Sequence, residues 1–159
     1  MTQTGSAPPL AKWLFGNLIN PIMRTILRSP LHSILSRQLL LLTFTGLKSG
    51  KQYTTPVGYD RDGDRLTLFT ASPWWKNFES RAPVTVRVRG ETLTGQAESS
   101  TDPETVARAI QADLETRGVG FVRRRHRLNL PADGDPSLDD IINAFHGKTL
   151  IRIDLDKNT

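Results

Sequence analysis

The residues best suited to chemistry lie in a short turn, Gly46-Leu47-Lys48-Ser49-Gly50-Lys51, between two stretches that are typical of strands. Two ammonium groups with a hydroxyl and a glycine between them suit a phosphate or carboxylate, because glycine lets the backbone approach such a ligand closely. An ordinary solvated loop with surface lysines is the alternative, and the turn alone leaves it open. The turn is not a P-loop, because only three residues separate Gly46 from Gly50 and Gln52 follows Lys51.

A second candidate is the segment Ala71-Ser72-Pro73-Trp74-Trp75-Lys76-Asn77-Phe78, which follows a stretch typical of a strand. Backbone groups exposed where a strand enters such a turn can hold the edge of a heteroaromatic ring. If the segment is helical, Trp74 and Trp75 point about 100° apart. One of them could then line a pocket while the other packs in the core, or both could simply pack the turn against the sheet.

Other kinds of chemistry lack support in the sequence. The histidines, His32, His126 and His146, lie in different segments without the spacing of metal ligands, so no metal site is predicted. The chain has no cysteine, and no arrangement suggests a Ser-His-Asp triad. A chemically active chain of this kind would depend on a cofactor. The net charge of +5 favours anionic partners, but the arginine-rich stretch 123–127 lacks interleaved aromatics, so no nucleic-acid partner is predicted.

The elements that must position these residues are mostly strands. A continuous apolar run at the first strand, hydrophobic alternation and turn signals predict about six of them, mostly joined by hairpins and therefore mostly antiparallel. They cover residues 39–45, 53–59, 65–70, 84–88, 92–98 and 149–155. Pro56 marks an edge or a bulge in the second strand, because proline cannot donate to the ladder. Helices are predicted from Thr101 to Gly118 and from Pro136 to Gly147. Strands of this number and length commonly curl into a small barrel, so the fold class is α+β.

The chain is predicted to form one domain over residues 1–159. Residues 1–8 are predicted to be a flexible arm, 9–36 to form short helices, and 37–159 to form the barrel with its inserted helices. The start of the chain lacks the pattern of a signal peptide, which favours a cytoplasmic location. The N-terminal helices could touch a membrane surface, but covering the open end of the barrel is the preferred interpretation.

The order and spacing of several short motifs resemble the deazaflavin-dependent nitroreductase family of the flavin/deazaflavin oxidoreductase superfamily. The motifs are the run 39–50, Thr55-Pro56, Asp62-Gly63-Asp64, Trp74-Trp75-Lys76-Asn77 and the run 82–86. The resemblance implies a split β-barrel and coenzyme F-420, a deazaflavin with a phosphate and an oligoglutamate tail. Some relatives in the superfamily instead use FMN, and others bind haem or fatty acids.

The same resemblance implies roles for particular residues. It places the cofactor phosphate at Lys48, Ser49, Gly50 and Lys51. Thr55 and Pro56 would lie beside the cofactor, and Thr70, Ala71 and Ser72 near the deazaflavin ring. Leu47 and Tyr53 stand where family members often carry arginine, and Lys51 is a candidate substitute for those charges.

The sequence therefore predicts an oxidoreductase that passes hydride from reduced coenzyme F-420 to an electron-poor acceptor, such as a quinone or nitro compound. Tyr53, Trp74 and Trp75 are predicted to shape the acceptor pocket, and no catalytic residue is named. FMN is the alternative cofactor. The alternative function is a non-catalytic split-barrel protein that binds a lipid, flavin or haem. Neither the acceptor nor the oligomeric state is predicted.

Overall fold

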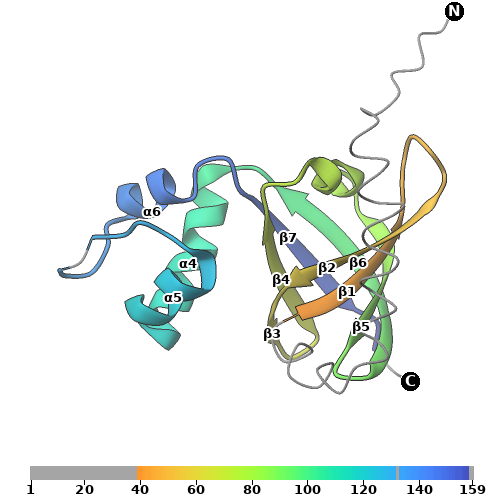
Figure 1. Ribbon diagram of the computed structural model, residues 1–159, viewed down its shortest axis with the longest axis horizontal. Helices are drawn as coiled ribbons and strands as arrows, with labels where there is room; N and C mark the ends of the chain where they lie inside the picture. The colour runs from red at the N-terminus through yellow and green to blue at the C-terminus, as the bar shows by residue number, and fades with distance from the viewer. Residues whose placement is uncertain (1–38, 132, 158–159) are drawn as a thin grey trace, which may run out of the picture.

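The computed structural model describes residues 39–131 and 133–157. The predicted arm over 1–8, the predicted helices over 9–36 and their predicted membrane contact lie outside the described residues. Figure 1 shows a barrel of strands with a group of helices to one side of it. This arrangement leaves a junction between the barrel and the helices.

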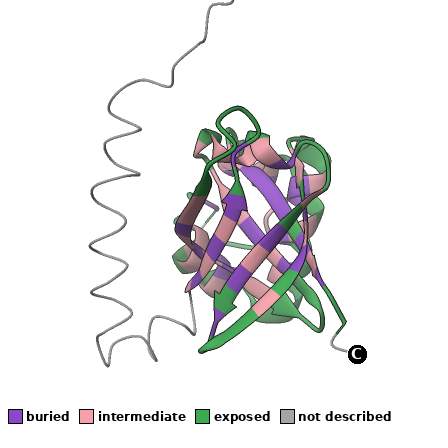
Figure 2. Cartoon of the chain, turned by 90° about the vertical axis from the view of Figure 1, so that its right-hand side faces the viewer, coloured by how far each residue is buried: buried purple, intermediate pink, exposed green. Residues whose placement is uncertain are grey.

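The barrel is a single antiparallel sheet of seven strands in the order β2-β1-β5-β6-β7-β4-β3. The strands are β1 Leu39–Thr45, β2 Gln52–Gly58, β3 Asp60–Asp62, β4 Arg65–Thr70, β5 Ala82–Val88, β6 Glu91–Ser100 and β7 Thr149–Leu155. The edge strands β2 and β3 are consecutive in sequence, with only Tyr59 between them. The sheet must therefore curl until its edges approach, as Figure 2 shows. The predicted α+β split barrel is confirmed, with β3 as a strand beyond the six expected.

Alternating side chains explain the curl and the core. In β1 the buried residues Leu40, Leu42 and Phe44 point into the barrel, and the residues between them are more exposed. Pro56 lies in the edge strand β2, as its missing N–H requires. At Gly95 in β6 a Cβ atom would stand 2.5 Å from a backbone oxygen of β7, so this strand pair approaches too closely for any side chain.

The helices gather around a second hydrophobic cluster that includes Leu150 of β7. They are α4 Pro103–Arg117, α5 Val119–His126 and α6 Leu138–Ala144, and the short 3₁₀ helix η2 Pro73–Phe78 packs separately on the barrel. Asp102 caps α4 through Thr105, whose side-chain hydrogen bond lowers the pKa of Asp102. The sequence predicts α4 and α6 but not α5. In the described part of the chain no helix has the length and apolar character needed to cross a membrane.

Candidate functional site

The β1–β2 turn is a compact loop closed by its own backbone. Gly46 N donates to Lys51 O and Gly50 N donates to Gly46 O, both at 2.8 Å. Gly50 has a φ of +64°, which favours glycine, and a Cβ on Gly46 would stand 2.7 Å from both Ser49 Oγ and the Tyr53 ring. The turn is therefore shaped by its two glycines, and it leaves the side chains of Lys48 and Lys51 exposed.

Helix η2 is tied to this turn through Asn77. Leu47 N donates to Asn77 Oδ1 at 2.9 Å, and Asn77 Nδ2 donates to Trp74 O at 2.8 Å. The Trp74 ring stacks on the Phe44 ring with 5.8 Å between the ring centres, and the centres of the Phe44 and Tyr53 rings are also 5.8 Å apart. The turn, the start of β2 and η2 thus form one packed unit, with the Tyr53 hydroxyl 2.9 Å from Ser49 Oγ.

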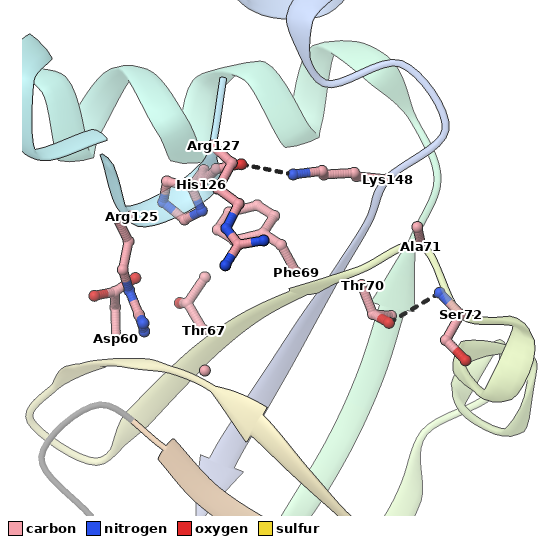
Figure 3. Close-up of a pocket in the computed structure, with 11 residues that line it drawn as sticks. Asp60, Thr67, Phe69, Thr70, Ala71, Ser72, Arg125, His126, Arg127 and Lys148 are labelled. Atoms are coloured by element: carbon pink, nitrogen blue, oxygen red, sulfur yellow. Dashed lines mark hydrogen bonds between the residues drawn. The ribbon is translucent and has the colours of Figure 1, made fainter. Parts of the chain in front are cut away.

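A pocket of about 430 Å³ lies at the junction of the barrel and the helices (Figure 3). One end of the pocket is formed by Thr70, the last residue of β4, and by Ala71 and Ser72, which follow it. The other end carries Asp60 and Arg125. The remaining lining residues come from β2, β4, the end of α5 and the segment before β7, and they are Gly58, Thr67, Phe69, His126, Arg127 and Lys148. The pocket therefore joins an apolar ring, hydroxyl groups and three cationic side chains.

Two of the cations are fixed by main-chain carbonyl groups. Arg125 Nη2 donates to Tyr59 O at 2.6 Å, and its guanidinium lies over Gly58, where a Cβ would be 3.0 Å from Nη1. Lys148 Nζ donates to His126 O at 2.9 Å and stands 5.1 Å from the centre of the Phe145 ring. Burial lowers the pKa of Lys148, because desolvation disfavours its charged form. These cations are half-buried and held in place before any ligand arrives.

The predicted site residues fall into two groups that η2 connects. Lys48, Ser49, Gly50, Lys51, Tyr53 and Trp74 belong to the turn, and Thr70, Ala71 and Ser72 belong to the pocket. Ser72 directly precedes η2, and Asn77 lies near the end of η2. At about 2 Å of rise per residue, the two groups are on the order of 10 Å apart along η2.

The other predicted residues contribute less to either group. Thr55 is buried in β2 with 8% of its surface exposed, and its neighbour Pro56 is half-buried. Trp75 is half-buried against the barrel core, with Lys76 Nζ 5.8 Å from its ring centre. The role of Tyr53, Trp74 and Trp75 in an acceptor pocket stays a prediction, because none of the three lines the pocket in Figure 3.

Comparison with protein families decides the relationship of the chain. The model of the F420H(2)-dependent quinone reductase family matches residues 28–119, more than half of the chain. The chain belongs to this family. The match confirms the predicted superfamily and the predicted dependence on coenzyme F-420. The alternative cofactor FMN is also compatible with the match. It does not favour the alternative of a non-catalytic binding protein.

Solved structures resemble this F420H(2)-dependent quinone reductase family member only distantly. An F420-H2 dependent reductase is 17% identical over 74% of this chain and 94% of that chain, with a TM-score of 0.43. A FAD-binding protein from Mesorhizobium loti is 18% identical, covering 81% and 91%, with a TM-score of 0.41. A FAD and haem binding protein from Mycobacterium smegmatis is 18% identical, covering 81% and 66%, with a TM-score of 0.44. A search of curated proteins found no match.

The sequence missed the residues that α5 brings to the pocket. The sequence shows Arg125, His126 and Arg127 only as part of a basic stretch, and it gives Asp60 no recognisable role. The positive φ of Gly118 ends α4 and starts α5 directly, which turns the basic stretch into a helix end facing β4. The one available signal was the apolar pair Phe121-Val122 after Gly118, of which Val122 is buried.

Proposed function

We propose that this chain is an oxidoreductase that uses reduced coenzyme F-420 to reduce an electron-poor organic acceptor of the quinone type. The family match over residues 28–119 carries the proposal, and the matched region includes both the β1–β2 turn and the strand end at Thr70–Ser72. A small-molecule acceptor and a cytoplasmic location belong to the same proposal. Nitro compounds are the second class of acceptor that the same hydride chemistry would serve.

The β1–β2 turn fits the phosphate of the cofactor. The exposed Gly50 has nothing within 4 Å of the position its Cβ would take, so a ligand can reach the backbone there. Lys48 and Lys51 flank this point with exposed ammonium groups, and neither has an ion-pair partner among the described residues. We assign the phosphate to Lys48, Ser49, Gly50 and Lys51, since ammonium and backbone N–H groups together suit an anion.

The pocket fits the reacting end of the ligands. Reduced coenzyme F-420 supplies a hydride when it is bound. Reduction of a quinone places negative charge on a carbonyl oxygen, and Arg125 and Lys148 supply fixed positive charge in a partly enclosed pocket. Donors held in place before the reaction stabilise such an oxygen without having to reorganise. Thr70–Ser72 would then position the ring system, and the phosphate would reach along η2 to the turn.

Titration of the purified chain with coenzyme F-420, followed by tryptophan fluorescence, tests the assignment. Trp74 and Trp75 lie on η2, between the turn and the pocket, so bound cofactor should change their emission. The double variant Lys48→Ala/Lys51→Ala should weaken binding by about a hundredfold, because each charge-assisted contact contributes about 1.5 kcal/mol.

A matched control removes the same charge elsewhere. Arg124 and Lys157 are both exposed and neither lines the pocket, so Arg124→Ala/Lys157→Ala should bind the cofactor nearly as the wild type does. Equal loss in both double variants would show a general charge effect and contradict the phosphate assignment. No saturable binding of coenzyme F-420 by the wild type would contradict the proposed function itself.

A further inference from the structure

Three side chains with metal-binding atoms meet beside the pocket, from parts of the chain far apart in sequence. Asp60 comes from β3, Asp113 from α4 and His126 from the last residue of α5. One ligand atom from each lies within 4.8 Å of the other two. Asp60 and His126 also line the pocket (Figure 3), so the cluster lies in the wall between the barrel and the helices.

The imidazole of His126 is buried and incompletely bonded. Its side chain is 7% exposed, and Nε2 has no hydrogen-bond partner among the described residues. Asp113 Oδ2 lies 3.6 Å from Nε2, so the nitrogen faces the Asp113 carboxylate. Edge contacts with Phe69 at 5.1 Å and Phe145 at 5.4 Å hold the ring. Buried polar atoms normally have partners, and this unpaired nitrogen lies beside a carboxylate that could share a ligand with it.

Arg117 partly neutralises the two carboxylates. Its Nη1 lies 2.6 Å from Asp60 Oδ1 and its Nε lies 3.7 Å from Asp113 Oδ1. Both contacts use Oδ1 atoms, whereas Asp113 Oδ2 faces His126. The Arg117 side chain is 38% exposed and lies 5.0 Å from the Phe121 ring centre, at the open side of the cluster. It can therefore move away from the carboxylates without crossing the core.

We propose that Asp60, Asp113 and His126 bind a divalent transition-metal ion. Their ligand atoms fit Zn²⁺ best. One imidazole nitrogen and two carboxylate oxygens are ligands that Zn²⁺ accepts, with water in the fourth tetrahedral position. Mg²⁺ and Ca²⁺ prefer oxygen ligands in larger number. At zinc–ligand distances near 2.1 Å, tetrahedral ligand atoms are about 3.4 Å apart. The 3.6 Å between His126 Nε2 and Asp113 Oδ2 is already close to this value.

The bound ion would join β3 to α4 and α5 across the pocket wall. Its ligands come from all three elements, so binding would stabilise the junction between the barrel and the helices. The bound ion would also satisfy His126 Nε2 and release Arg117 to solvent. The site is independent of the phosphate assignment, because no residue of the β1–β2 turn takes part in it, although Asp60 and His126 also line the pocket.

Calorimetric titration of the chelator-treated full-length chain with Zn²⁺ tests the site. We expect saturable one-to-one binding and a raised Tm, and titration with Co²⁺ should give the strong visible absorption of tetrahedral coordination. His126→Gln and Asp113→Asn should each weaken binding at least about tenfold. Arg117→Met should tighten it by about tenfold, because the competing charge is gone. A gain of affinity cannot come from misfolding. Arg117→Met therefore still tests the proposal if His126→Gln and Asp113→Asn are unstable.

Two further histidines serve as matched controls. His146 is exposed after α6, and His32 lies outside the described residues. His146→Gln and His32→Gln should bind Zn²⁺ as the wild type does. The proposal is overturned if the wild type shows no saturable binding up to millimolar Zn²⁺, or if His126→Gln and Asp113→Asn bind unchanged. Loss of binding in either control would place the ion elsewhere and overturn it equally.

Discussion

The β1–β2 turn and the pocket both present positive charge, but they hold it in different ways. Lys48 and Lys51 are exposed on flexible stems, whereas Arg125 and Lys148 are half-buried and each donates to a main-chain carbonyl. Exposed charges are screened by salt and act mainly when a ligand brings its own charge. Charges held in a partly enclosed pocket can act on charge that develops during a reaction. The contrast suits cofactor binding at the turn and acceptor chemistry in the pocket.

The largest expected effect tests whether the pocket wall is part of the folded core. Phe69 packs edge-on against His126 at 5.1 Å and Phe145 at 5.3 Å. Phe69→Ala should lower the free energy of unfolding by about 2–3 kcal/mol, below the range for a fully buried Phe because Phe69 is half-buried. Urea unfolding measures it. On the turn, Tyr53→Phe removes the hydroxyl that contacts Ser49 and should cost about 0.5 kcal/mol. If both variants lowered the free energy of unfolding equally, the pocket wall would be no more part of the folded core than the turn is.

The second test separates binding from chemistry. Arg125→Met should lower kcat/KM for a quinone acceptor by about 10- to 100-fold, because a charge-assisted contact to the developing oxygen anion contributes about 1.5–3 kcal/mol. The affinity for coenzyme F-420 should change little, since Arg125 lies in the pocket and not at the turn. Steady-state kinetics and the fluorescence titration measure the two quantities. A variant that loses cofactor affinity and keeps kcat would assign Arg125 to the phosphate instead.

The sequence predicts the turn better than the pocket, and the reason is distance along the chain. The turn is local: Gly46, Gly50 and their neighbours set its shape within six residues, and β1 and β4 begin and end where the local sequence pattern places them. The pocket instead depends on where α5 docks. Its apolar residues are few among the arginines, so periodicity did not reveal the helix. The meeting of Asp60, Asp113 and His126 follows only from that docking.

The third test uses salt to compare the two regions. If exposed lysines hold the cofactor phosphate, the Kd for coenzyme F-420 should rise several-fold between about 50 mM and 500 mM NaCl, because the Debye length shortens over this range. Lys48→Ala/Lys51→Ala should show a shallower dependence, and Arg125→Met should keep the slope of the wild type. The fluorescence titration repeated at several salt concentrations gives the slopes. A steeper loss in the double variant than in the wild type would contradict the assignment of the phosphate to the turn.

The smallest expected effect concerns the burial of Lys148, which distinguishes the pocket from the exposed turn. Desolvation lowers the pKa of Lys148 in the folded chain below its value in the unfolded chain. Between these two values the unfolded chain holds the proton more often, so the free energy of unfolding should rise as pH increases towards the unfolded value.

Lys148→Met and Lys148→Arg both remove this titration, and either can serve as the reference. The stability difference between wild type and each reference should therefore grow in favour of the wild type as pH rises towards the pKa of the unfolded chain, with the same slope for both. Urea unfolding across this range measures it, and other titrating groups cancel in the difference. A difference that shrinks with rising pH would mean that the folded chain favours the charged form. A difference that does not change with pH would mean that Lys148 resembles a solvated surface lysine, and the contrast between pocket and turn would rest on Arg125 alone.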